Sequence, residues 1–205
     1  MTAEPEATRG AADAVPLRRR GEVLESAIFG ATLRQLVTDG YARLTMEGVA
    51  AAAQTGKAAL YRRWSSKEEL VMDALRASLP PAGPAPDTGS LRGDLVEVVT
   101  RLRTAMFSES GAAVRAVMSE LDHERAHAFL EIVLVRVVEP TTRLIAEVLS
   151  RGAVRGEVRA AAVTPLVIDV VPALMLYRFK MCGGAPVRLD PEAIVDEVLL
   201  PMVRP

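Results

Sequence analysis

The run MEGVAAAAQTGKAALYRRW, from Met46 to Trp64, constrains the fold of this 205-residue chain more than any other stretch. Six of its residues are alanine, the strongest helix former, so propensity alone favours one continuous helix. The central triplet Gln54-Thr55-Gly56 interrupts that helix, and a basic cluster follows it. We therefore predict two short helices, the first ending near Ala53 and the second running from Gly56 to about Arg63, joined by a turn.

Two flanking helices complete this unit. Apolar residues recur at helical spacing from Glu22 to Asp39, and Gly40 follows where a left-handed helix end is expected. Thr45 suits the cap of the first short helix, and Ser66 suits the cap of a further helix that stops at Leu79. Two short helices joined by a three-residue turn and preceded by a third helix define a helix-turn-helix unit.

A segment rich in proline and glycine, from Pro80 to Gly89, separates this unit from the rest. Its four prolines and two glycines cannot continue a helix. We place a domain boundary there and expect a disordered tail at 1–16, a helix-turn-helix domain at 17–79 and a second helical domain at 90–205. The helices predicted in the last domain are Ser90–Phe107, Gly111–Asp122, Glu124–Val138, Pro140–Arg155, Pro165–Cys182 and Pro191–Val203, with Pro172 expected to kink its helix.

The composition favours an all-α protein. The chain is 50% hydrophobic but only 4% aromatic, with few of the turn pairs that mark β-hairpins. We predict a three-helix helix-turn-helix DNA-binding domain followed by a C-terminal antiparallel helical bundle. The most apolar stretch, Val163 to Tyr177, is short and interrupted by prolines and Asp169, so no membrane span is expected.

The single cysteine, Cys182, excludes an intramolecular disulfide and a cysteine-based zinc site, so a reducing cytoplasm fits best. The first fifteen residues lack the apolar segment of a signal peptide. His123 and His127 lie four residues apart, a spacing that can chelate a metal with a further ligand, but solvated surface histidines are the simpler interpretation. We predict no metal and no cofactor, and an inert Cys182 rather than a redox sensor.

Positive charge is concentrated in the helix-turn-helix domain at 17–79, hereafter the first module; the domain at 90–205 is the second module. Residues 16–67 hold nine basic and four acidic residues, although the whole chain has a net charge of −1. Such a module favours a polyanionic partner, unless the excess is a chance fluctuation. Lys57, in the first turn of the second short helix, suits a phosphate or a guanine edge, and Tyr61 can donate to a phosphate. Val49, Ala53 and Leu60 are expected to face inward.

The run GYARLTMEGVAAAAQTGKAALYRRWSSKEEL, from Gly40 to Leu70, resembles the DNA-binding domain of the TetR family of bacterial transcriptional repressors. The resemblance implies phosphate contacts at Thr45, Tyr61 and Lys67, base-facing positions at Lys57, Ala58 and Ala59, and a basic arm for the minor groove. The complete set expected to contact DNA is Arg18, Arg19, Arg20, Thr45, Thr55, Lys57, Ala58, Ala59, Tyr61, Arg62 and Lys67.

The turn departs from the pattern of that family. Gln54-Thr55 stands where the family usually has Gly-Val, and Gly56 stands where it has Ser or Thr. Glutamine in a left-handed turn position costs about 1 kcal/mol compared with glycine. Glycine caps a helix less well than serine by a few tenths of a kcal/mol.

The resemblance also implies a function: a dimeric, ligand-responsive repressor that binds a palindromic operator and is released by a small, largely apolar effector. A constitutive DNA-binding regulator without effector is the alternative. A helical enzyme is disfavoured because the sequence has no phosphate-binding loop, catalytic triad or complete metal set.

The resemblance further implies that the domain at 90–205 binds an effector and forms the dimer. Two residue sets suit these roles, each with core packing as its alternative. The expected dimer interface is Ile168, Val171, Met175, Val195, Val198, Leu199 and Met202. The expected effector pocket is Met106, Phe107, Met118, Phe129, Met175, Tyr177 and Arg178. Arg178 can meet an anionic group of the effector, although a surface or ion-paired arginine is the simpler interpretation.

Overall fold

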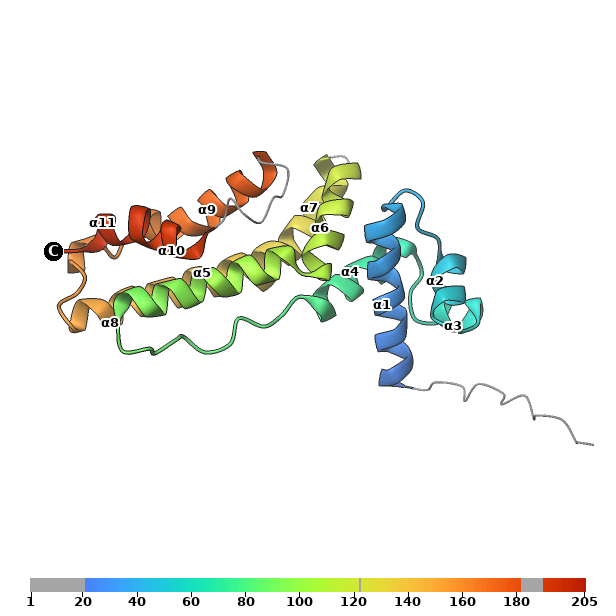
Figure 1. The fold of residues 1–205 in the computed structure, drawn as a ribbon. Helices are drawn as coiled ribbons and strands as arrows, with labels where there is room; N and C mark the ends of the chain where they lie inside the picture. Colours follow the sequence, from blue (N-terminus) through green and yellow to red (C-terminus); the bar gives the residue numbers. More distant parts are fainter. Residues whose placement is uncertain (1–20, 122, 182–189) are drawn as a thin grey trace, which may run out of the picture.

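A computed structural model describes residues 21–121, 123–181 and 190–205. Every regular element in these ranges is helical, which confirms the all-α prediction (Figure 1). In chain order the elements are α1 (Glu22–Asp39), α2 (Met46–Ala52), α3 (Lys57–Tyr61), α4 (Lys67–Ser78), α5 (Leu91–Phe107), α6 (Glu109–Glu120), α7 (His123–Val133), the π turn η1 (Leu134–Val138), α8 (Glu139–Val154), the 3-10 turn η2 (Ala160–Ala162), α9 (Pro165–Met181), α10 (Pro191–Ile194), the π turn η4 (Val195–Leu199) and α11 (Leu200–Val203).

Some predictions fall on residues that the structure does not describe. The tail at 1–16, the basic arm Arg18–Arg20 and Cys182 lie outside the described ranges. In the part of the chain that is described, no helix is both long enough and apolar enough to cross a membrane.

The first apolar core lies within the helix-turn-helix unit. It is built from fully buried side chains of α1, α2, α3 and α4, among them Ile28, Leu36, Val49, Leu60 and Leu70. The predicted caps are confirmed, since the hydroxyl of Thr45 accepts the Gly48 N–H and that of Ser66 accepts the Glu69 N–H. The pair of short helices predicted from the sequence is therefore present.

This first core extends beyond the helix-turn-helix unit. Buried side chains of α6 and α7, namely Ala113, Val117 and Phe129, belong to the same cluster. Figure 1 shows α6 and α7 beside α1 and α4, at the end of the C-terminal bundle nearest the first module. The first module is thus packed directly against part of the second.

The second apolar core fills the long C-terminal bundle. It joins α5, α8, α9 and the terminal helices through buried residues such as Leu95, Ile145, Val171 and Leu199. The segment from 80 to 89, hereafter the linker, contains no helix, as its prolines predict, and runs alongside α5 (Figure 1). It connects α4 with the distant end of α5.

One helix prediction was wrong. We expected separate helices at Glu124–Val138 and Pro140–Arg155, but α7, η1 and α8 form a continuous helical path. A proline in a helix removes one N–H and its ring clashes with the carbonyl four residues earlier. The π turn directly before Glu139-Pro140 relieves this clash, and the same arrangement recurs at η4 before Leu200-Pro201.

Candidate nucleic-acid interface and effector cavity

The turn between α2 and α3 closes as a Schellman motif. The N–H of Thr55 donates to the carbonyl oxygen of Ala50 at 2.9 Å, and the N–H of Gln54 donates to that of Ala51 at 3.0 Å. Gln54 has a φ of 56° and, within the described ranges, is the one non-glycine residue with a positive φ. The left-handed position predicted at Gln54 is confirmed, and the turn directs α3 away from α2.

Helix α3 buries one side and exposes the other. The residues predicted to face inward from α2 and α3 are fully buried: Val49, Ala53 and Leu60. The exposed side carries four of the residues predicted to contact DNA: Lys57, Ala58, Tyr61 and Arg62. Thr45 is exposed as well, whereas Thr55, Ala59 and Lys67 are half-buried. The structure thus gathers most of the predicted DNA-contacting set around α3.

Lys57 has an acidic neighbour on the same surface. Its ammonium forms an ion pair with the carboxylate of Glu47, and more than half of each side chain is exposed. The hydrogen bond between them lowers the pKa of Glu47 and raises the pKa of Lys57, so both stay charged at neutral pH. The same ammonium lies 5.5 Å from the ring centroid of Tyr61. A DNA phosphate or base would therefore compete with Glu47 for Lys57.

Lys67 makes contacts that the sequence did not predict. Its Nζ donates to the carbonyl oxygens of Tyr41 at 2.9 Å, Ala42 at 3.3 Å and Leu44 at 3.4 Å. An ammonium has three donors, so these bonds use its full capacity. Lys67 therefore holds the loop between α1 and α2, and its phosphate contact stays a prediction.

The end of α3 is attached to the helices beneath it. Arg63 donates to the Glu25 carboxylate of α1 at 2.6 Å, and the indole N–H of Trp64 donates to Asp73 of α4 at 3.0 Å. The Trp64 ring also packs against Phe29, with centroids 5.7 Å apart. These residues were not in the set predicted to contact DNA. The single tryptophan of the sequence, directly after Arg62 and Arg63, could have indicated a packing site at the end of α3. These contacts support the orientation of α3.

Comparison with protein families agrees with this geometry. Residues 28–74 match the model for bacterial regulatory proteins of the tetR family, and residues 85–198 match the model for the tetracyclin repressor-like C-terminal domain. The chain belongs to the TetR family. The resemblance inferred from residues 40–70 is thereby confirmed, and it extends to the second domain.

Full-length relatives support the assignment. An uncharacterized HTH-type transcriptional regulator of Mycobacterium tuberculosis is 33% identical over 177 residues, which cover 86% of each chain. The DNA-binding transcriptional repressor TetR of Mycobacteroides abscessus is 32% identical over 190 residues, covering 91% of this chain and 97% of that repressor. This TetR-family member is thus a DNA-binding transcriptional regulator and not an enzyme.

A solved structure shares the fold. The transcriptional regulator FadR of Bacillus subtilis, in complex with stearoyl-CoA, aligns with a TM-score of 0.62 at 15% identity. The alignment covers 86% of this chain and 96% of FadR. At this identity the likeness concerns the fold alone.

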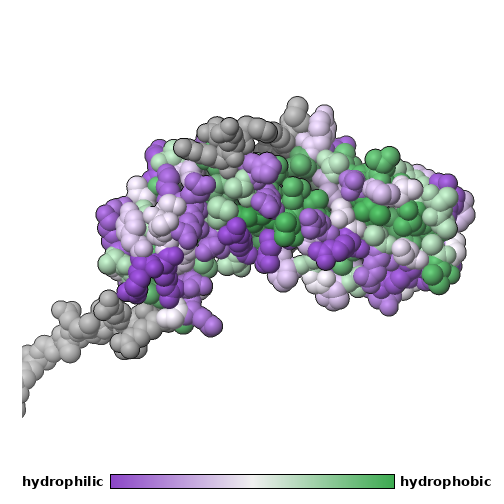
Figure 2. All heavy atoms as spheres, turned by 180° about the vertical axis from the view of Figure 1, so that it is seen from behind, coloured by the Kyte–Doolittle hydropathy of each residue, from purple (hydrophilic) through white to green (hydrophobic). Residues whose placement is uncertain are grey.

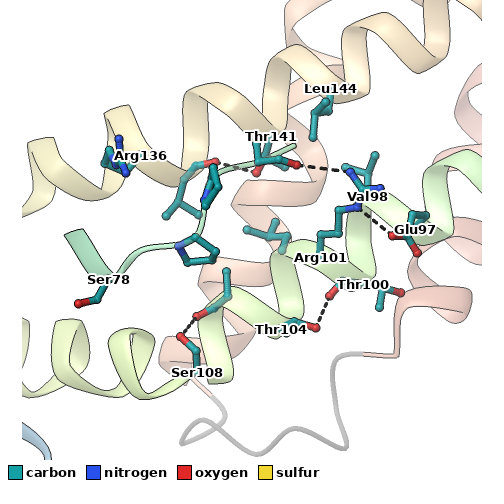
Figure 3. A pocket seen from close by; sticks show the side chains of 16 residues that line it. Ser78, Glu97, Val98, Thr100, Arg101, Thr104, Ser108, Arg136, Thr141 and Leu144 are labelled. Carbon is teal, nitrogen blue, oxygen red and sulfur yellow. Dashed lines mark hydrogen bonds and ion pairs between the residues drawn. The ribbon is translucent and has the colours of Figure 1, made fainter. Parts of the chain in front are cut away.

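The C-terminal domain of this TetR-family regulator contains a cavity of about 530 Å³. It lies between the linker, α5 and the junction of η1 with α8, and the end of α4 reaches it through Ser78 (Figure 3). Its apolar lining comes from Pro80, Pro81, Ala82, Val98, Leu102, Ala105, Val137 and Leu144. The volume falls within the range of small-molecule sites.

The polar lining of the cavity consists of hydroxyl groups and three charged side chains, Glu97, Arg101 and Arg136. The hydroxyls of Thr104, Ser108 and Thr141, which line the cavity, donate to carbonyl oxygens of nearby helical residues (Figure 3), and Ser108 also accepts the Gly111 N–H. Arg101 is paired with Glu97 at 2.8 Å, whereas Arg136 is exposed. One more basic than acidic side chain therefore lines the cavity.

A polar network that the sequence analysis missed holds the linker in place. The fully buried carboxylate of Asp94 accepts the N–H and hydroxyl of Thr88 at 2.6 and 2.8 Å, and lies 3.4 Å from Arg155. Arg151 donates to the carbonyl of Pro86, and Arg101 to that of Pro84 at 2.7 Å. A buried carboxylate needs such partners, and these bonds fasten one wall of the cavity.

The structure does not bring the seven predicted pocket residues into this cavity. Two of them belong to or pack against the first core: Phe129 and Met118. Three belong to or pack against the second core: Met106, Phe107 and Met175. Two are exposed on α9: Tyr177 and Arg178. The core-filling alternative therefore describes five of the seven.

The predicted dimer interface needs a correction. Four of its residues have no exposed surface within a single chain: Val171, Met175, Val195 and Leu199. A side chain without exposed surface cannot contact a second copy, so these four form the second core instead. The other three retain exposed surface: Ile168, Val198 and Met202.

Helix α9 exposes apolar residues that the prediction did not include. Leu166 is 81% exposed and Leu176 is 57% exposed, and Tyr177 beside it is 62% exposed. Figure 2 shows hydrophobic residues gathered over the C-terminal half, while the surface of the first module is largely hydrophilic.

Within the described ranges, no group of three or more His, Cys, Asp or Glu side chains could hold a metal ion, and His127 is exposed.

Proposed function

We propose that this TetR-family regulator is a dimeric repressor that binds a palindromic operator and is released by a small, largely apolar effector. The observation that carries the proposal is the exposed side of α3, which bears Lys57 and Tyr61 and is followed by the exposed Arg62. Helix α3 lies at the outer end of the molecule (Figure 1). A recognition helix of this kind enters the major groove with its N-terminal residues toward the bases. Lys57 occupies that first turn.

The proposed contacts divide into two kinds. Thr45, Tyr61, Arg62 and Lys67 fix the register on the phosphates, while Lys57 and Ala58 face the base edges. The complete proposed set adds the half-buried Thr55 and Ala59 and the arm Arg18, Arg19 and Arg20. Because Lys57 is the one charged base reader on α3, much of the sequence preference would come from DNA shape.

The dimer is proposed to form over the exposed side of α9. Leu166, Leu176 and Tyr177 place exposed apolar surface on this helix. Ile168, Val198 and Met202 stay in the proposed set because they retain exposed surface. Two copies related by a two-fold axis would cover this surface and present two α3 helices to one operator. Half-sites would then lie about one helical turn of DNA apart, or a multiple of it.

The effector site is proposed to be the cavity beside the linker. Its apolar walls favour a hydrocarbon body, and the excess positive charge at Arg101 and Arg136 favours a carboxylate or phosphate end. The complex of FadR with stearoyl-CoA supports this ligand class by analogy only. A constitutive regulator without effector remains the alternative, and the cavity is the feature that favours a ligand-responsive one.

The test is a ligand series against the full chain. Straight-chain carboxylates of increasing length, with the matching alcohols, are titrated while thermal stability and DNA binding are followed. We expect the acids to raise the unfolding temperature and release DNA, and Arg136→Gln to weaken acid binding about tenfold. If no acid changes either signal, the ligand class is wrong. If DNA binding proceeds normally and no small molecule releases it, the constitutive alternative holds.

A further inference from the structure

The loop between α1 and α2 (residues 40–44, the α1–α2 loop) is held from two sides. On one side, Lys67 of α4 donates to three of its carbonyl oxygens. On the other, the N–H of Ala42 donates to the carboxylate of Glu120 at 2.6 Å. Glu120 is the last residue of α6, so a residue of the C-terminal domain bonds directly to the backbone of the DNA-binding domain.

Glu120 belongs to a continuous contact along α6. Ser110, Ala113, Val117 and Glu120 follow helical spacing on one face of this helix. Ser110 donates to the carbonyl of Ser78 at 3.0 Å, and Ala113 and Val117 are fully buried in the first core. Helix α6 is therefore joined to the DNA-binding domain by a hydrogen bond at each end and by apolar packing between them (Figure 1).

The side chain of Tyr41 strengthens the same junction. Its ring is nearly buried and meets the ring of Phe129 from α7 edge-on, with centroids 6.0 Å apart. The ammonium of Lys67 lies 4.6 Å from the same ring centroid. Elements α4, α6 and α7 thus converge on two residues of the loop, Tyr41 and Ala42.

The loop leads directly into the cap of α2. Thr45 follows it without an intervening residue, and the hydrogen-bonded Schellman turn at Gln54 connects α2 directly to α3. A displacement of the loop therefore carries both short helices with it. We propose that Glu120 is a positioning residue for DNA binding: through the Ala42 N–H it sets the orientation of α2 and α3, without touching DNA.

The other end of α6 adjoins the effector cavity. Ser108, which lines the cavity, caps α6 by accepting the Gly111 N–H at 3.1 Å. The helix spans roughly 18 Å from there to Glu120, at 1.5 Å per residue. If the cavity is the effector site, as proposed above, a bound effector tilts α6 and thereby moves the α1–α2 loop; this part rests on the proposed function. The positioning role of Glu120 stands without that part.

The experiment uses the full chain with Glu120→Ala and Glu120→Gln, and Glu131→Ala as a control. Glu131 is an exposed carboxylate on α7, so its removal changes the net charge equally. The probe is a DNA duplex selected from random sequences by the wild type. We expect Glu120→Ala to bind it about tenfold more weakly with an unchanged salt slope, because a hydrogen bond to a charged group is lost and no phosphate contact is.

Hydrogen exchange separates positioning from general destabilisation. In Glu120→Ala the amide of Ala42 should exchange several-fold faster while the amides of the first core keep their protection. Glu120→Gln keeps an acceptor oxygen and should recover most of the affinity. If Glu120→Ala binds DNA as tightly as Glu131→Ala, the proposal is overturned. Equal losses in Glu120→Ala and Glu120→Gln would overturn it too. A failed effector titration would leave these outcomes unaffected.

Discussion

The two apolar cores of this protein differ in how completely one chain covers them. The first core is enclosed by α1 to α4 together with α6 and α7, and the face of this module seen in Figure 2 is largely hydrophilic. Over the second core, α9 buries Val171 and Met175 but leaves Leu166 and Leu176 largely exposed. The first module is thus built to face water and DNA, whereas the second presents an apolar helix that a second copy would cover.

The largest effect is expected when charged residues are placed on the exposed side of α9. The double substitution Leu166→Glu with Leu176→Glu should give folded monomers, because both side chains are exposed within one chain. Affinity for operator DNA should fall at least about 100-fold, since two linked heads bind far more tightly than one. Analytical ultracentrifugation and DNA titration measure the two effects, and a persisting dimer would refute the proposed interface.

A buried residue of the same bundle provides the contrasting result. Leu199→Ala should cost about 2–5 kcal/mol of unfolding free energy, because Leu199 is fully buried and the change leaves a cavity. The subunit affinity of the remaining folded protein should change little. Denaturant unfolding at fixed protein concentration is the measurement. A stability loss below about 1 kcal/mol would contradict the assignment of Leu199 to the core.

On the first module, Arg62→Ala tests the DNA-facing side of α3. Loss of one phosphate contact should weaken binding for all sequences, by about tenfold, and reduce the salt slope by about 1. Arg63 is the matched control, because it is paired with Glu25 rather than presented to DNA. Arg63→Ala should leave the salt slope unchanged. Equal slopes for wild type and Arg62→Ala would remove Arg62 from the contact set.

A second Schellman turn ends α8, where the N–H of Glu157 donates to the carbonyl oxygen of Gly152 at 2.8 Å and that of Gly156 to the carbonyl oxygen of Ala153 at 3.1 Å. Comparing it with the turn at Gln54 gives a smaller and cleaner test. Gln54 and Gly156 both occupy the left-handed position, with φ of 56° and 78°, and the glycine has open space where a Cβ would stand. Gln54→Gly should stabilise the fold by about 1 kcal/mol and Gly156→Ala should destabilise it by a similar amount. These changes correspond to shifts of about 2–4 °C in Tm. Shifts of the same sign in both variants would contradict this account of the turns.

The smallest expected effect concerns the acidic neighbour of Lys57. Glu47→Gln removes a carboxylate from the DNA-facing surface and frees the Lys57 ammonium. DNA should then bind about threefold more tightly at low salt, and the gain should disappear as salt screens the charges. Fluorescence anisotropy at two salt concentrations measures it. Weaker binding would mean that Glu47 is needed to orient Lys57.

Local signals made the first module predictable. The cap residues Thr45 and Ser66, the interruption at Gln54 and the spacing of Val49, Ala53 and Leu60 each act within a few residues of the chain. Helix-turn-helix geometry depends on such short-range rules, so the amino-acid sequence alone predicts the two short helices and their exposed side.

Contacts between distant residues were not predictable. Helix α9 is apolar nearly all round, so its sequence did not reveal which side is buried, and two of its core residues, Val171 and Met175, were assigned to the dimer interface. The bond from Ala42 to Glu120 and the bonds from Lys67 to the α1–α2 loop join positions far apart in the chain. The linker prolines indicated only a break in the helices, although two of them, Pro80 and Pro81, line the cavity.

The central claim is that two copies of α3 bind DNA at two symmetric half-sites. Selection of random-sequence duplexes by the full chain, followed by sequencing and footprinting, tests it most directly. The account predicts a palindromic consensus whose half-site centres lie about 10 bp apart or a multiple of that spacing, with protection on both halves. Enriched sequences without two-fold symmetry, or protection of a single half-site, would contradict it.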